Sequence, residues 1–292
     1  MRIAVLGNDD KSRSLLETVN EYKDGVQTVS CPEDADCLYV PDYTSLGFHR
    51  AGKLLREGTY IFFGKMGTLD MDELDTLVRI ATEHHGAVVE YLHSACNPCL
   101  SALDKAVRQL EPIRRVRFCS CEYSFRCQNI CEASECQRAP GVPGGALIQR
   151  GLDCIYPLIR LFGMPEGLES ELVYGDNGMD VAGSVTGSVT GSMGPTEVEL
   201  IYSKISGSHI PSLIEGKHGS LLIRDLHNLR EVTCFNQLGQ EECIASFTSG
   251  DCGRAELERC MAFFTGALDW RAQLPVSRRI LQILREISGQ IS

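Results

Sequence analysis

The sequence predicts an α/β domain followed by an α+β domain: a shortened parallel sheet over residues 1–113, then a mostly antiparallel sheet with helices on one face over residues 114–292. In the first part, short apolar runs alternate with amphipathic helical segments, as in strand–helix–strand units of parallel sheets. In the second part, short strand-like segments follow one another, with Gly, Asn and Ser turns between them. A length of 292 residues leaves room for two such domains.

The unit over residues 58–93 shows the first pattern most clearly. Its apolar run Tyr60–Phe63 stops at a glycine, which is typical of a strand buried on both faces. From Asp70, apolar residues recur every three or four positions and predict a helix of about four turns, followed by a second strand over residues 87–92. Lys65 directly follows the first strand, at the edge where open α/β sheets place ligands and chemistry. A lysine that is simply solvated there is the alternative.

The turn after the first strand is where a dinucleotide-binding fingerprint would stand. A strand is predicted over residues 2–7 and a helix over residues 12–22. Between them, Gly7 is the one glycine that remains of the G-x-G-x-x-G pattern. Asp9 and Asp10 suit a helix N-terminus, but they put negative charge where a pyrophosphate would sit. The cofactor signal in this turn is therefore weak.

The rest of the first domain is too short for a complete nucleotide-binding half. Strands are predicted over residues 26–30 and 37–40, and the few residues between them leave no room for a further helix and strand. A helix over residues 44–57 then leads to the strand–helix–strand unit described above. After that unit, a helix starts at Asn97-Pro98 and runs to about residue 110, because proline is favoured near the first helical position.

The second domain begins with a predicted strand over residues 114–125, a loop rich in Cys, Pro and Gly to residue 145, and an apolar helix over residues 146–162. Strand-like segments then follow at residues 168–174, 184–193, 197–203, 220–224, 229–235 and 242–247. A repeated V-T-G-S unit over residues 185–192 is interpreted as a β segment with small side chains rather than a phosphate-binding loop. Helices over residues 255–267 and 277–288 complete the prediction.

Charge and hydropathy exclude several classes of partner. The formal net charge of -11 argues against nucleic acid and against anionic membranes, since both require a basic surface. No apolar run reaches the length of a membrane span. The first residues resemble a buried strand rather than a signal peptide, so we expect a cytoplasmic protein.

Fourteen cysteines are many for a chain of this length, and seven of them fall between Cys96 and Cys136. Without a secretory signal we expect reduced thiols that pack as small apolar side chains. A metal or redox role of this cluster is the alternative, although only the first pair has C-x-x-C spacing. Cys119 and Cys121 would share one face of their predicted strand, which suits either interpretation.

Four segments resemble motifs of one protein family and occur in that family's order. Residues 51–66 are similar to A-G-K-H-V-x-x-E-K-P, and residues 144–151 resemble G-G-A-L-x-D-x-G. Residues 161–165 match L-F-G-x-P, and residues 214–223 are similar to I-x-G-x-x-G-x-L-x-I. On these motifs the chain resembles the glucose-fructose oxidoreductase/inositol dehydrogenase (Gfo/Idh/MocA) family of NAD(P)-dependent oxidoreductases, as a divergent member. The resemblance implies a shortened, Rossmann-like nucleotide-binding domain followed by the family's α+β domain.

The resemblance also implies a set of site residues. Lys65 falls on the family's catalytic lysine, while Gln149 and Asp153 fall on the acid and the His or Tyr of the helix below the active site. A bound NAD or NADP is implied, with cofactor contacts at Gly7, Asn8, Pro41, Tyr43 and Lys65. In the family these groups pass a proton while hydride leaves a sugar or polyol carbon, and a lysine can exchange protons near neutrality when its pKa is lowered.

Departures from the family motifs separate two hypotheses about function. The neighbours of Lys65 are Gly64 and Met66 instead of an acid and a proline, and Gln149 cannot act as a base. The first hypothesis is a degenerate member with weak or no dinucleotide binding that acts as a binding or partner subunit. The second is an active oxidoreductase of a sugar, cyclic polyol or related substrate that uses Lys65. The resemblance further implies a homodimer, and a heteromer with an intact homologue is the alternative.

Overall fold

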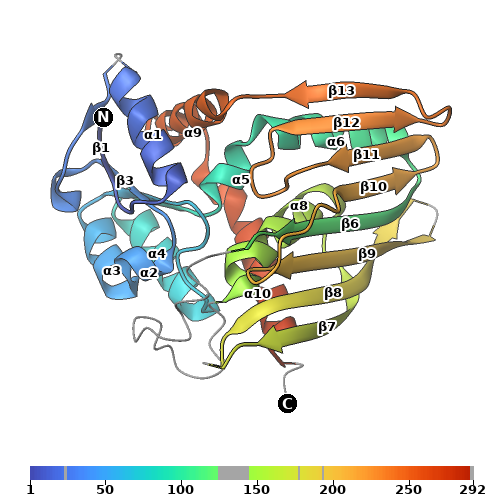
Figure 1. The fold of residues 1–292 in the computed structure, drawn as a ribbon. Coiled ribbons are helices and arrows are strands. Elements are labelled where there is room, and N and C mark those ends of the chain that lie inside the picture. The colour runs from blue at the N-terminus through green and yellow to red at the C-terminus, as the bar shows by residue number, and fades with distance from the viewer. Residues whose placement is uncertain (23–24, 124–144, 177, 193, 290–292) are drawn as a thin grey trace. The chain divides into compact units, whose positions relative to one another are not determined.

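The computed structural model describes residues 1–22, 25–123, 145–176, 178–192 and 194–289. The chain forms two compact units (Figure 1), one made of Met1–Pro98 and Thr248–Leu281 and the other of Cys99–Phe247 and Gln282–Ser292. The sequence places the domain boundary after residue 113, and the return of a later segment to the first unit is not visible in the sequence pattern. The two-domain division at residue 113 stays a prediction.

The first unit is built on a five-stranded parallel sheet with strand order β2-β1-β3-β4-β5. Its strands are β1 (Arg2–Val5), β2 (Gln27–Thr28), β3 (Cys37–Val40), β4 (Tyr60–Phe63) and β5 (Ala87–Val89). All four residues of β3 are buried, as expected for a central strand of a parallel sheet. Only the short 3₁₀ turn η1 (Pro32–Asp34) lies between β2 and β3, so this nucleotide-binding half lacks a helix, as the sequence predicts.

Helices in the first unit differ from the sequence prediction at two places where the backbone is left-handed. The helices are α1 (Asp10–Glu21), α2 (Tyr43–Leu46), α3 (Phe48–Arg56), α4 (Met71–Glu83), α5 (Leu92–Cys96), α9 (Ser249–Phe264) and η4 (Trp270–Gln273). Gly47, with φ of 76°, divides the predicted helix over residues 44–57 into α2 and α3. Tyr91, with φ of 57°, separates β5 from α5, so the strand predicted over residues 87–92 is shorter than expected.

Helix α9 completes the core of the first unit, although it lies far along the chain. Leu257, Cys260 and Phe263 of α9 are buried in the same apolar cluster as Ile3 and Leu15. The ring of Phe263 stacks on that of Phe62 of β4, with ring centroids 6.3 Å apart. Figure 1 shows α9 beside α1.

The second unit is built on an eight-stranded sheet with strand order β13-β12-β11-β10-β6-β9-β8-β7. Its strands are β6 (Ile113–Cys121), β7 (Glu166–Tyr174), β8 (Asp180–Gly191), β9 (Gly194–Ser203), β10 (Ser212–Gly216), β11 (Gly219–Ile223), β12 (Glu231–Asn236) and β13 (Glu241–Ser246). Strands β6 and β9 pair in parallel, and the other neighbouring strands pair antiparallel. All of the V-T-G-S repeat except its last residue, Ser192, lies within β8, so its interpretation as a β segment is confirmed.

The two faces of this sheet have different characters. Helix α8 (Leu152–Phe162) and the π-helical turn η3 (Leu147–Gly151) pack against β6, β8 and β9, where Val116 and Phe118 are buried. On the other face, Arg117 forms an ion pair with Glu199 at 2.5 Å. Helices α6 (Pro98–Leu110) and α10 (Leu274–Gly289) complete the described elements. Among the described helices, none is both long and apolar enough to cross a membrane.

Candidate functional site

The turns after β1, β3 and β4 meet at the carboxyl edge of the parallel sheet, because these strands are neighbours that run in the same direction. The backbone N–H of Lys65 donates to the carbonyl oxygen of Pro41 at 3.0 Å. Gly7 has φ of 91°, and a Cβ atom there would lie 2.3 Å from Cγ of Pro41. The fold therefore brings Gly7, Pro41 and Lys65 to one edge. Asn8 is exposed in the same turn as Gly7, and Tyr43 begins α2.

The N-terminus of α1 is occupied by the side chain of Asp9. Its Oδ1 accepts hydrogen bonds from the backbone N–H groups of Lys11 and Ser12, both at 3.0 Å. The hydroxyl of Ser12 donates to Oδ2 of Asp9 at 2.7 Å. Partial burial opposes ionisation of Asp9, but the hydrogen bonds from Ser12 outweigh it, so the pKa of Asp9 lies below its ordinary value. Asp9 therefore carries a negative charge at neutral pH.

This arrangement is unsuited to a dinucleotide bound in the usual place. In sheets of this kind the pyrophosphate lies at the N-terminus of the first helix and accepts hydrogen bonds from its backbone N–H groups. In α1 two of those donors already bond to Asp9, and the carboxylate would repel a second anion. The residues present at this turn do not fit a pyrophosphate.

Lys65 lies half-buried in a loop that Glu90 holds in place. The backbone N–H of Gly67 donates to Oε1 of Glu90 at 2.6 Å, and the N–H of Tyr91 donates to the carbonyl oxygen of Lys65 at 2.5 Å. Burial raises the pKa of Glu90, although hydrogen bonds from Ser277 and from the loop backbone oppose this effect. The loop that carries Lys65 is thus fixed through its backbone.

Gly64 replaces the acid of the family motif for a steric reason. A Cβ atom at Gly64 would lie 2.4 Å from the hydroxyl oxygen of Tyr39 and 3.1 Å from Nε2 of His93. The two rings occupy the space beside the strand end, so any side chain before Lys65 would collide with them. The packing of Tyr39 and His93 beside the strand end therefore explains why position 64 carries no acid.

A buried hydrogen-bonded chain of Tyr39, His93 and Glu256 lies beneath this edge. The hydroxyl of Tyr39 is 2.6 Å from Nε2 of His93, and Nδ1 of His93 is 2.5 Å from Oε1 of Glu256. Burial, together with the charge of Glu256, raises the pKa of Tyr39, so the phenol keeps its proton and donates to His93. Sequence reasoning missed this chain, because Glu256 is 163 residues from His93 and no local motif joins them.

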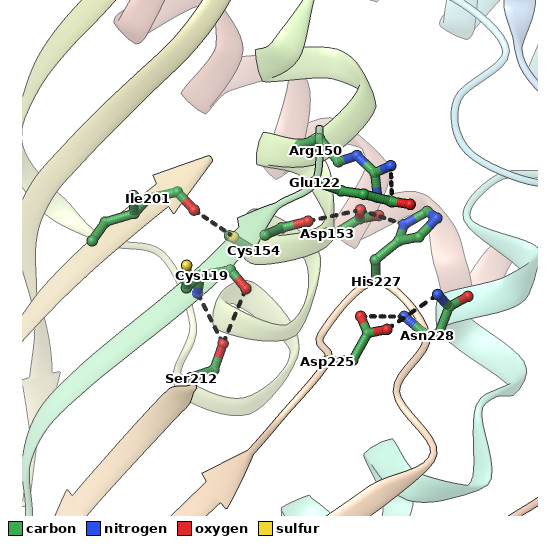
Figure 2. Close-up of polar contacts among 11 residues, drawn as sticks. Cys119, Glu122, Arg150, Asp153, Cys154, Ile201, Ser212, Asp225, His227 and Asn228 are labelled. Carbon is green, nitrogen blue, oxygen red and sulfur yellow. Dashed lines mark hydrogen bonds and ion pairs between the residues drawn. The ribbon is translucent and has the colours of Figure 1, made fainter. Parts of the chain in front are cut away.

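In the second unit, Asp153 is hydrogen-bonded to a histidine that sequence reasoning did not identify. Oδ2 of Asp153 lies 2.7 Å from Nδ1 of His227, and the hydroxyl of Ser120 lies 3.3 Å from the same oxygen (Figure 2). The side chain of Asp153 is 8% exposed and that of His227 is 23% exposed. An imidazole held by a buried carboxylate is an arrangement suited to accepting and donating a proton.

Local structure explains how the two side chains meet. Asp153 lies in the first turn of α8 against β6, whereas His227 lies in the connection between β11 and β12. That connection is shaped by Asp225, whose Oδ1 accepts a hydrogen bond from the backbone N–H of Asn228 at 3.0 Å. The only signal in the sequence is a histidine within a short polar turn, which is too common to identify a site.

Gln149, the other predicted residue of the helix, is exposed and lies one turn before Asp153. Its neighbour Arg150 pairs with Glu122 at the end of β6, as Figure 2 shows. The predicted residues thus fall into two groups, one at the carboxyl edge of the first unit and one on η3 and α8 of the second.

The cysteines of the predicted cluster are only partly described. Cys127, Cys131 and Cys136 lie outside the described residues. In the part of the chain that the structure describes, no group of three or more His, Cys, Asp and Glu side chains is arranged to hold a metal ion. Cys119 and Cys121 do share a face of β6, with their Sγ atoms 3.7 Å apart.

Comparisons with known proteins agree with the architecture, although no family model matches the chain. It is 27% identical over 207 residues to the uncharacterized oxidoreductase YgjR of Escherichia coli, a match that covers 70% of this chain and 62% of YgjR. It is 25% identical over 225 residues to the scyllo-inositol 2-dehydrogenase (NADP(+)) IolU of Bacillus subtilis, covering 75% of this chain and 66% of IolU. The chain thus matches slightly less than two thirds of the length of these curated relatives.

Solved structures of oxidoreductases share the fold of both units. A mutant of KijD10, a 3-ketoreductase from Actinomadura kijaniata in complex with TDP-benzene and NADP, superposes with a TM-score of 0.77 at 16% identity, covering 99% of this chain and 97% of that one. The putative oxidoreductase yvaA from Bacillus subtilis gives a TM-score of 0.71 at 16% identity, with coverages of 99% and 96%.

These relatives and solved structures are consistent with the resemblance of the chain to the Gfo/Idh/MocA family. The chain's shortened parallel sheet and eight-stranded sheet are the two domains that the resemblance implies, so the predicted fold class is confirmed. The positions that depart from the family motifs are those at the carboxyl edge of the first unit and at the start of α8.

Proposed function

We propose that this protein has weak or no affinity for NAD or NADP and acts as a binding or partner subunit. One observation carries the proposal: the carboxylate of Asp9 occupies the N-terminal backbone N–H groups of α1. In oxidoreductases of this architecture the same groups are the main cradle of the pyrophosphate. The names of the relatives and neighbours, which include NADP, support a family origin in dinucleotide chemistry.

Two further features support this proposal. A Cβ atom added at Gly7 would collide with the ring of Pro41, the residue that follows β3. The turn after β1 therefore packs directly against the end of the neighbouring strand. The acid that precedes the catalytic lysine in the family is absent, and Tyr39 and His93 fill its space. Each change alone would weaken cofactor binding, and all of them lie at the same edge of the sheet.

Titration of the purified protein with NADH and NADPH, followed by calorimetry and by nicotinamide fluorescence, tests this proposal. We expect no saturable binding at micromolar concentrations of either cofactor. Saturable binding with a micromolar Kd would overturn the proposal. Light scattering of the protein alone, and of the protein with an intact family member from the same cell, would then distinguish a homodimer from a heteromer.

A second candidate function is an active oxidoreductase that acts on a sugar, a cyclic polyol or a related hydroxy or keto substrate. The observation that favours it is the hydrogen bond between Asp153 and His227, which supplies an acid–base group at the position of the family's His or Tyr. The resemblance separately implies Lys65 as a proton-transfer residue of such an activity. If either cofactor binds, Lys65→Met should abolish turnover, and unchanged turnover would remove Lys65 from the mechanism.

A further inference from the structure

Two thiols of the second unit lie in direct contact on one face of β6. Cys119 and Cys121 are two residues apart, so their side chains point to the same side of the strand. Their Sγ atoms are 3.7 Å apart, which is van der Waals contact between two sulfur atoms. Ser120, between them, points to the opposite face and contacts Asp153. Figure 2 shows Cys119 where β6 meets Ser212, whose hydroxyl accepts from the N–H of Cys119 at 2.8 Å.

The surroundings of the pair favour one thiolate. A hydrogen bond from Cys121 lowers the pKa of Cys119 to about 6; burial opposes the shift, while a hydrogen bond from Ser208 and the charge of Arg117 add to it. The pKa of Cys121 is raised, chiefly because its proton is held by the sulfur of Cys119. These shifts favour the thiolate at Cys119 over the thiolate at Cys121. Cys121 is partly exposed, and Cys119 is 8% exposed.

We propose that Cys119 and Cys121 form a site of reversible thiol oxidation, which a small hydroperoxide converts to an intramolecular disulfide. The thiolate of Cys119 attacks a peroxide oxygen and breaks the O–O bond, which gives a sulfenic acid and releases hydroxide or an alkoxide. The thiol of Cys121 then attacks that sulfur, forms the S–S bond and releases water. The two thiols together lose two electrons, and the peroxide accepts them.

Strand geometry makes this disulfide easy to reduce again. Residues two apart on an extended strand are separated by about 6.6–6.8 Å between Cα atoms, which is the upper end of the range that a disulfide can span. The bond would therefore be strained, and strained disulfides have higher reduction potentials than structural ones. Cys121 is the last residue of β6, so the strand end can bend toward Cys119 without breaking the sheet interior.

Oxidation of the two thiols would also affect the hydrogen-bonded pair of Asp153 and His227. Drawing Cys119 and Cys121 together bends the backbone at Ser120, whose hydroxyl contacts Oδ2 of Asp153. The same oxygen holds Nδ1 of His227. We expect the oxidised protein to lose or lengthen the contact of Ser120 with Asp153 and to shift the imidazole of His227. This inference is independent of the proposed function, because it involves neither the dinucleotide turn nor Lys65.

Peptide mass spectrometry tests the proposal directly, because trypsin separates this pair from all other cysteines. The tryptic peptide of residues 118–126 contains Cys119 and Cys121 alone, and that of residues 80–105 contains Cys96 and Cys99 alone. The second pair is a matched control, since both thiols are buried and burial raises the pKa of Cys96. The folded protein is treated with hydrogen peroxide near pH 7, excess thiols are blocked, and the two peptides are compared before and after reduction.

We expect the peptide of residues 118–126 to lose two hydrogen masses at least about tenfold faster than the control peptide, because the thiolate is the reactive form. A thiol reductant should restore it. Cys121→Ser should leave a sulfenic acid at Cys119 that a cyclic diketone traps, and Cys119→Ser should remove the reaction. Equal oxidation rates of the two peptides, or oxidation to sulfonic acid without a disulfide, would overturn the proposal. The rate comparison needs no variant, so it stands even if a substitution impairs folding.

The histidine signals provide a second measurement. In the wild-type protein, peroxide should move the ring-proton resonances of His227, assigned by their loss in His227→Asn. The same treatment should leave them in place in Cys119→Ser. Movement of the His227 resonances in that variant would show that the coupling through Ser120 is wrong.

Discussion

Replacing Asp9 by glycine should strengthen the binding of a dinucleotide to this chain. The substitution gives the sequence G-N-G after β1, which restores the second glycine of the fingerprint. It removes the carboxylate from the N-terminus of α1 and frees the N–H groups of Lys11 and Ser12 for a pyrophosphate. Glycine is also tolerated as a helix N-cap, at a cost of a few tenths of a kcal/mol relative to aspartate, so α1 should remain folded.

The expected gain follows from the charge that is removed. Two unit charges about 4 Å apart repel by about 1 kcal/mol in water and by about 4 kcal/mol at the effective dielectric constant near a protein surface. Asp9 is only partly shielded from water, so we take about 2 kcal/mol, counting one phosphate charge. Since 1.4 kcal/mol corresponds to tenfold, Asp9→Gly should tighten NADPH binding by about 30-fold. The freed N–H groups add to this figure.

Calorimetric titration of the variant with NADPH measures this gain, and Asp10→Gly is the matched control. Asp10 is the adjacent acid on the same helix, and its exposed carboxylate pairs with Arg13 instead of with the helix N-terminus. The two variants have the same net charge, so a long-range effect would appear in both. If Asp9→Gly binds no more tightly than Asp10→Gly, the charge of Asp9 is not what excludes the cofactor. Because the pKa of Asp9 is lowered, Asp9 stays ionised between pH 7 and pH 5, and binding to the wild type should not improve over that range.

Three further variants test the packing and polar contacts of the two units. Phe263→Ala should lower the free energy of unfolding of the first unit by about 3–5 kcal/mol in urea titrations, and a loss below about 1 kcal/mol would contradict the packing of α9 in that core. Asp153→Asn should destabilise the second unit by about 1 kcal/mol, because a hydrogen bond of His227 to a charged acceptor becomes one to a neutral acceptor; equal urea midpoints would show that the pair adds no stability. The raised pKa of Glu90 means that the folded state binds its proton more tightly than the unfolded state, so stability falls as the pH rises above the ordinary glutamate range. Glu90→Gln should flatten this pH dependence in urea titrations at pH 5 and pH 8, whereas Glu83→Gln, at an exposed position, should retain it.

Local patterns were sufficient for most of the elements. The predicted strand at Cys37–Val40 and the predicted helix ending at Leu110 have the observed bounds or nearly so, because apolar runs and proline at a helix start act within a few residues. The predicted helix over residues 44–57 is interrupted at Gly47, since one left-handed residue ends a helix whatever the periodicity around it.

The chain's own sequence also indicated the resemblance to the Gfo/Idh/MocA family and the departures from its motifs. Motif spacing located Lys65, Gln149 and Asp153, and the acids after Gly7 by themselves indicated a poor pyrophosphate cradle. These are local features, in which neighbouring residues along the chain already carry the chemistry.

Only the tertiary structure decided which side chains complete each site. It joined Glu256 to His93 across 163 residues and His227 to Asp153 across 74 residues. It also showed that Tyr39 excludes a side chain at Gly64. Such contacts depend on strand order and on the helix that returns to the first unit, and those are set by packing over the whole chain rather than by the spacing of residues within a segment.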